Sequence, residues 1–188
     1  AVEAMDLDEA SKERLIRESL RRLVLHEVGH TLGLNHNFKG SNLLNYEEIK
    51  NKETTYEKGL CSSVMEYPSI NFSLEPENQG LYYDTIPGPY DHWAIRFAYS
   101  QVDEKGLKEI LDESTKPEHA FANDADDMRG TGKGMDPDAM IYDLTSEPVL
   151  YAIDRIKLVN KILPELLEKY RRTRDSHQKL LNSYYILT

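Results

Sequence analysis

The chain has 188 residues, 23 basic and 33 acidic, giving a formal net charge of −10, and 39% of its residues are hydrophobic. This length suits one domain, or one domain with a helical extension, and the composition is that of a folded chain, not a disordered one. The acidic balance argues against nucleic acid and anionic membrane surfaces as partners, because both attract basic proteins.

The sequence offers no membrane span and no leader. No stretch approaches the roughly 18 apolar residues of a membrane helix, and the first residues, AVEAMD, lack the basic and apolar regions of a signal peptide. Because the first residue is not methionine, we expect a processed product or a fragment of a longer parent chain. A single cysteine, Cys61, excludes an intramolecular disulfide framework and a cysteine-based zinc knuckle.

The first predicted element is an amphipathic helix over residues 6–34. Its apolar residues recur at steps of three and four, the spacing of one helix face. They are Leu15, Ile16, Leu20, Leu23, Val24, Val28 and Leu32. Asp6 or Asp8 is expected to cap the start, and Gly33 to end the helix, because glycine readily adopts the left-handed conformation found there.

After this helix the periodicity is lost. Residues 35–88 are rich in Asn, Ser, Gly, Pro and Tyr, which predicts irregular loops with one short helix near residues 46–51. Two helices are then predicted at residues 89–99, where Pro89 suits a first turn, and at residues 102–111.

A second loop is predicted at residues 116–138, followed by a helix that begins at residue 148. Pro164 either kinks that helix or opens another at residues 165–181. No convincing alternating strand pattern is found, so the chain is predicted to be mainly α.

Three of the six histidines lie in one segment, HEVGHTLGLNH, from His26 to His36. His26 and His30 are four positions apart, so on a helix both imidazoles project from one face and can bind one tetrahedral ion. A bend at Gly33 would let His36 supply a third nitrogen, leaving the fourth position open as in catalytic zinc sites. From composition alone, a chance match to this pattern is on the order of one in ten thousand or less.

The segment matches HExxHxxGxxH, and the chain therefore resembles the metzincin zinc metallopeptidases. The sequence SVMEY at residues 63–67 resembles the methionine turn that lies beneath the metal in that superfamily, with Met65 as its methionine. NFKGS at residues 37–41 and GPYDHWAI at residues 88–95 resemble a family of large, mostly uncharacterised bacterial metzincin-like proteins. The resemblance extends weakly further and covers most of the chain.

The resemblance implies roles for individual residues. His26, His30 and His36 would bind Zn²⁺, Glu27 would be the general base and acid, and Met65 would form the hydrophobic floor of the site.

Tyr67 occupies the position from which a tyrosine in astacin-like and serralysin-like metzincins reaches the metal or the developing oxyanion. A phenol suits that role, because it can donate a hydrogen bond to a tetrahedral intermediate. The other interpretation is that Tyr67 packs beneath the loop.

The implied function is that of a zinc metalloendopeptidase-like hydrolase. Glu27 would assist the attack of a zinc-bound water on a peptide or protein substrate. The family resemblance also suggests an exported protein, in the periplasm, at the cell surface or secreted.

The implied fold class is an α+β zincin catalytic domain, in which a β-sheet precedes the active-site helix. Only 25 residues precede His26 here, and nearly all belong to the predicted helix. The upstream sheet is therefore expected to come from a longer parent chain, and activity without it is left open. Residues 1–100 are predicted to hold the active-site helix, zinc-binding loop and methionine turn, and residues 101–188 a helical C-terminal extension.

Three alternatives stay open at this stage. The chain is either a peptidase or a non-catalytic zinc-binding scaffold or interaction module derived from one, although an intact Glu27 argues for the peptidase. In another zincin group, an acidic residue such as Glu47 or Glu48 would replace His36 as a ligand. The acidic residues 124–127 suit calcium weakly, and a solvated charge cluster is the default interpretation.

Overall fold

The computed structural model describes residues 7–127, 136–173 and 177–187. Within these ranges the chain forms six α-helices, joined by irregular segments and short 3₁₀ helices, and no β-strand. The α-helices are α1 (Glu9–Thr31), α2 (Lys52–Lys58), α3 (Pro89–Tyr99), α4 (Glu104–Asp112), α5 (Pro148–Thr173) and α6 (His177–Leu187). The 3₁₀ helices are η1 (Gly40–Leu43), η2 (Glu48–Lys50), η3 (Pro76–Asn78), η4 (Glu113–Thr115) and η5 (Pro117–His119). The mainly α prediction is confirmed for the described residues.

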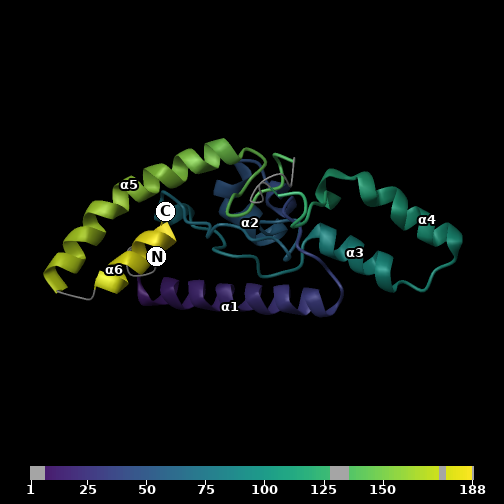
Figure 1. Ribbon diagram of the computed structural model, residues 1–188, viewed down its shortest axis with the longest axis horizontal. Coiled ribbons are helices and arrows are strands. Elements are labelled where there is room, and N and C mark those ends of the chain that lie inside the picture. The colour runs from purple at the N-terminus through teal and green to yellow at the C-terminus, as the bar shows by residue number, and fades with distance from the viewer. Residues whose placement is uncertain (1–6, 128–135, 174–176, 188) are drawn as a thin grey trace.

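Helix α1 runs along one edge of the molecule, opposite α5, while α3 and α4 form a pair at one end (Figure 1). Asp8 caps α1 by accepting a hydrogen bond from the Ser11 backbone N–H at 2.8 Å. The helix ends at Thr31, and Gly33 then takes a left-handed φ of 88°, as predicted. The other predicted cap, Asp6, lies outside the described residues.

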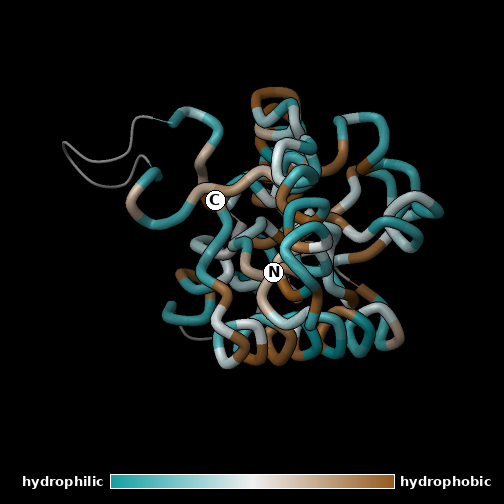
Figure 2. Tube along the Cα trace, turned by 90° about the vertical axis from the view of Figure 1, so that its right-hand side faces the viewer, coloured by the Kyte–Doolittle hydropathy of each residue, from teal (hydrophilic) through white to brown (hydrophobic). Residues whose placement is uncertain are grey.

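Only one side of α1 is buried. Leu15, Glu18, His26 and Gly29 face the interior. Most of the apolar residues that predicted this helix lie on its other side and are between 46% and 61% exposed: Ile16, Leu20, Leu23, Val24 and Val28. Along the lower edge of Figure 2, where α1 lies, the tube carries both hydrophobic and hydrophilic residues. The described part of the chain therefore leaves the apolar outer face of α1 uncovered.

Helix α5 closes the core on the inner side of α1. Its residues Leu158, Ile162, Leu166 and Tyr170 are one turn apart and pack with Leu15 of α1 and with Phe72 and Tyr82. Burying an aliphatic side chain of this size stabilises the fold by about 2 kcal/mol.

Pro164 lies inside α5, which continues past it as one curved helix (Figure 1). The helix therefore does not end at Pro164, and the alternative of a separate helix at residues 165–181 is wrong. The next helix is α6, which begins at His177.

The long segment between α1 and α3 is irregular, as predicted, but buried side chains hold it in place. Asp84 accepts a hydrogen bond from the Leu60 backbone N–H at 2.6 Å, and Glu18 of α1 accepts one from the Tyr82 backbone N–H at 2.6 Å. The short helix expected at residues 46–51 is replaced by η2 and by α2, which Asn51 caps at the Thr54 backbone N–H.

Among the described residues, no helix combines the length and the apolar composition that crossing a bilayer requires.

Candidate metal centre

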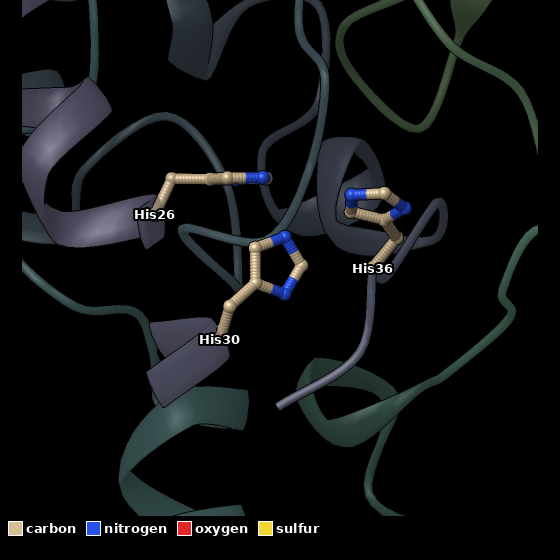
Figure 3. A group of neighbouring side chains, drawn as sticks. All are labelled: His26, His30 and His36. Carbon is tan, nitrogen blue, oxygen red and sulfur yellow. The ribbon is translucent and has the colours of Figure 1, made fainter. Parts of the chain in front are cut away.

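Helix α1 and the turn that follows it bring three histidines together. His26 and His30 project from successive turns of α1, and His36 faces them from the chain beyond Gly33 (Figure 3). One nitrogen from each ring can be chosen so that all three nitrogens lie within 4.8 Å of one another. His26 is buried, His36 is half-buried and His30 is exposed, so the group opens to solvent on one side.

Each imidazole is oriented through its Nδ1 atom. His26 Nδ1 lies 2.8 Å from the carbonyl oxygen of Val64, and His30 Nδ1 lies 3.0 Å from that of Leu34. His36 Nδ1 lies 2.7 Å from Oδ2 of Asp124. Carbonyl and carboxylate oxygens only accept hydrogen bonds, so the network assigns the proton of each ring to Nδ1. Each Nε2 atom then carries the lone pair that a cation would use.

These residues fit zinc. Neutral imidazole nitrogens are common zinc ligands, and three protein ligands leave a fourth coordination position for water or substrate. Burial lowers the pKa of His26, and this favours the neutral ring that a metal needs. The hydrogen-bond acceptors behind each ring are of the kind that orients metal-binding histidines elsewhere.

Residues 63–67, the segment that resembles a methionine turn, contact His26 through Val64 and His36 through Tyr67. Met65 is fully buried, and its sulfur packs so closely on Gly29 that a Cβ added there would lie 2.4 Å from Sδ. The backbone N–H of Asn37 donates to the Met65 carbonyl oxygen at 3.2 Å, which ties the turn to the residue after His36.

Asp91 at the start of α3 holds the methionine turn from below. Its carboxylate accepts hydrogen bonds from the Ser63 hydroxyl at 2.6 Å and from the backbone N–H groups of Val64 and Gly88, both at 2.9 Å. Burial raises the pKa of Asp91. Because Val64 also supplies the carbonyl that orients His26, the position of this turn determines the geometry of the site.

Tyr67 is close to the histidines, not packed away beneath the loop. Its hydroxyl lies 2.7 Å from His36 Nε2 and donates to it in the tautomer assigned above. The Arg22 guanidinium lies 5.7 Å from the centre of the Tyr67 ring and donates a hydrogen bond to the Glu66 carbonyl oxygen.

Glu27 follows His26 on α1 with an exposed side chain. Within the part of the chain that the structure describes, its carboxylate takes part in no hydrogen bond or ion pair.

The candidate ligands Glu47 and Glu48 are engaged elsewhere. Glu47 pairs with Lys50 and Glu48 with Lys58. Among the residues that the structure describes, no second group of three His, Cys, Asp or Glu side chains is close enough to hold a metal ion. The geometry thus favours His36 over either glutamate as the third ligand.

Sequence reasoning missed the residues that support this site. Asp124 was expected in a solvated charge cluster, but it contacts His36 across 88 positions of sequence. Asp91 and Arg22 carried no signal of their own, although Asp91 lies inside the GPYDHWAI segment that the family resemblance singled out. Only contacts between distant segments could have identified them.

The comparisons with known proteins agree with this geometry. A family model described as Met-zincin matches residues 8–187, a range that includes the three histidines, Met65 and all of the described helices. No curated protein and no solved structure matches the chain.

Proposed function

The chain belongs to the Met-zincin family, and from that premise we propose that it is a zinc-dependent metallopeptidase that hydrolyses peptide bonds. The observation that carries this proposal is the group of three imidazoles, each oriented through Nδ1, with the exposed Glu27 directly after His26 in α1. His26, His30 and His36 would hold the zinc ion through their Nε2 atoms.

The proposed roles of the chain's own residues follow from their chemistry. When bound, zinc would supply a Lewis acid that polarises the peptide carbonyl and lowers the pKa of water to about 7. The Glu27 carboxylate would take the proton from the attacking water and deliver it to the leaving amine.

Tyr67 would donate a hydrogen bond to the oxyanion that develops on the substrate. Its hydroxyl now uses the lone pair of His36 Nε2. A single lone pair serves either the tyrosine or a metal ion. Metal binding would therefore release the hydroxyl for an acceptor on the substrate.

We also propose that the apolar outer face of α1 packs against the upstream part of a longer parent chain. Five large apolar side chains at about half exposure support this, because a contiguous apolar patch on a soluble protein commonly marks a contact surface. A hydrophobic dye should bind this chain more strongly than a longer chain that includes the upstream part. Equal binding would count against the proposal. An exported location is proposed on the family resemblance alone.

The test of the function begins with metal content. Protein purified without chelator and resupplied with zinc should hold near one zinc per chain, and the double variant His26→Ala, His30→Ala should hold none. The Glu27→Gln variant should keep the metal and lose peptide hydrolysis by about 10²–10⁴-fold, the usual contribution of a general base. Absence of zinc from the wild type would overturn the proposal. Bound zinc without Glu27-dependent hydrolysis, in this chain and in the longer parent, would favour a non-catalytic zinc-binding module.

A further inference from the structure

The loop that carries Asp124 is fastened to the residue that follows His36. The buried Asn37 side chain donates from Nδ2 to the Ala120 carbonyl oxygen at 3.0 Å, and its Oδ1 accepts from the Ala122 backbone N–H at 3.2 Å. The Phe38 backbone N–H adds a bond of 2.7 Å to the Ala122 carbonyl oxygen. Residues 120–122 and 37–38 therefore form one unit, and the site histidine lies next to it.

This arrangement places the Asp124 carboxylate directly behind His36. Oδ2 lies 2.7 Å from Nδ1 of the ring. The Phe38 ring stacks on the same imidazole, with 5.4 Å between the ring centres. His36 lies beyond α1, in a segment without regular structure, so side-chain contacts orient its ring, and Asp124, Phe38 and Tyr67 are among them. The backbones of His26 and His30, in contrast, are placed by α1.

We propose that Asp124 is a positioning residue, which holds His36 in the Nδ1-protonated tautomer and turns its Nε2 toward the metal position. A neutral imidazole can carry its proton on either nitrogen, and an acceptor at Nδ1 selects the form with a free Nε2. A carboxylate in this position also makes the ring a stronger electron donor to a metal. The proposal rests on the proposed function in one respect, that His36 is a metal ligand.

The contact is specific to Asp124 within its acidic loop. Its neighbour Asp126 points back into the loop and accepts a hydrogen bond from the Asn123 backbone N–H at 2.9 Å. Asp126→Ala therefore disturbs the loop without removing the acceptor behind His36, which makes it the matched control for Asp124→Ala. Asp124→Asn keeps a neutral oxygen acceptor and tests rescue by a conservative change.

The first experiment uses the metal-free protein with ¹⁵N-labelled histidine. Correlation spectra of the ring nitrogens report the tautomer of His36, and we expect Nδ1–H in the wild type and in Asp126→Ala. In Asp124→Ala the population should shift toward Nε2–H, and Asp124→Asn should restore it at least partly. An unchanged tautomer in Asp124→Ala would overturn the proposal.

The second experiment measures zinc affinity by competition with a chromogenic chelator. Asp124→Ala should bind zinc about 10–100-fold more weakly than the wild type, the usual effect of losing such a partner, and Asp126→Ala should stay close to the wild type. Equal losses in the two variants, or no loss in Asp124→Ala, would overturn the proposal. If the wild type binds no zinc while the tautomer still follows Asp124, the proposed metal function fails and the orienting role of Asp124 stands.

Discussion

The Tyr67 hydroxyl and a metal ion would compete for the same atom, Nε2 of His36. In Tyr67→Phe we predict that kcat for peptide hydrolysis falls by about 10²-fold, because one donor to the oxyanion is lost. Zinc affinity should stay the same or rise, because the competing hydrogen bond is gone. Steady-state kinetics and chelator competition on the same preparations measure both quantities. Weaker zinc binding would mean instead that Tyr67 supports the ligand.

The close contact with Met65 leaves no room for a side chain at Gly29. We predict that Gly29→Ala lowers the free energy of unfolding by about 1–3 kcal/mol, because the new Cβ would lie 2.4 Å from Sδ of a fully buried side chain. Urea denaturation measures this loss. The double variant Gly29→Ala, Met65→Ala should be more stable than the sum of the two single losses predicts, since the space left by the thioether accommodates the methyl group. Strict additivity would contradict the contact.

At the scale of elements, α3 supports the site through Asp91. In Asp91→Ala the hydroxyl of Ser63 and the backbone N–H groups of Val64 and Gly88 lose their acceptor. Each buried donor left without a partner costs about 1–3 kcal/mol, so we predict a large loss of stability in urea denaturation. Zinc affinity should fall as well, because Val64 also orients His26.

The control for this prediction is Asp112→Ala, at the exposed end of α4, where only an ion pair with Lys108 is lost. Its effect should stay within about 0.5 kcal/mol. Asp91→Asn should lie between the two, because an amide keeps one of the two oxygens. An Asp91→Ala protein as stable as Asp112→Ala would mean that the methionine turn does not depend on α3.

Elements with local signals could be predicted from the sequence. The apolar periodicity of α1 and the Gly88–Pro89 start of α3 both predict helices, and the bounds 89–99 are those of the structure. Helix α2 was missed because KETTYEK has no apolar face, and its only signal is the cap at Asn51. Which side of α1 would be buried could not be predicted, because the face with the stronger apolar pattern is the exposed one.

Some residues of the candidate site could likewise be predicted from the sequence, and others could not. The three histidines lie in one segment, and helix geometry with the turn at Gly33 explains why their imidazoles meet. The metzincin resemblance that this segment suggested is confirmed by the family match. Asp124 and Asp91 contact the site from segments that are distant in the sequence. Such contacts leave no local sequence pattern, so the roles of these two residues could not be predicted before the fold was known.

For the whole molecule, burial makes stability depend on pH. Burial raises the pKa of Glu66 from its ordinary value of 4.5 to about 8, so the folded protein holds a proton that the unfolded chain releases. This contribution is fully present below pH 4.5 and is lost as the pH rises through about 8. His26, whose pKa is lowered by burial, acts in the opposite direction only below its ordinary value of 6.5.

We therefore predict that the free energy of unfolding falls as the pH rises from 6.5 to about 8. Urea denaturation at constant ionic strength across this window measures the slope. In Glu66→Gln the slope should flatten, whatever the overall stability of the variant. A wild-type stability that rises across the window would contradict this prediction.

The apolar outer face of α1 also gives the molecule a calorimetric signature. Water around exposed Ile, Leu and Val side chains raises the heat capacity of the solution, and the heat capacity falls when those side chains are covered. Any partner segment that covers α1 should therefore bind with a negative heat-capacity change, and its binding enthalpy should become more favourable as the temperature rises. Titration calorimetry at several temperatures would measure this change, and polar substitutions on the outer face of α1 should reduce it.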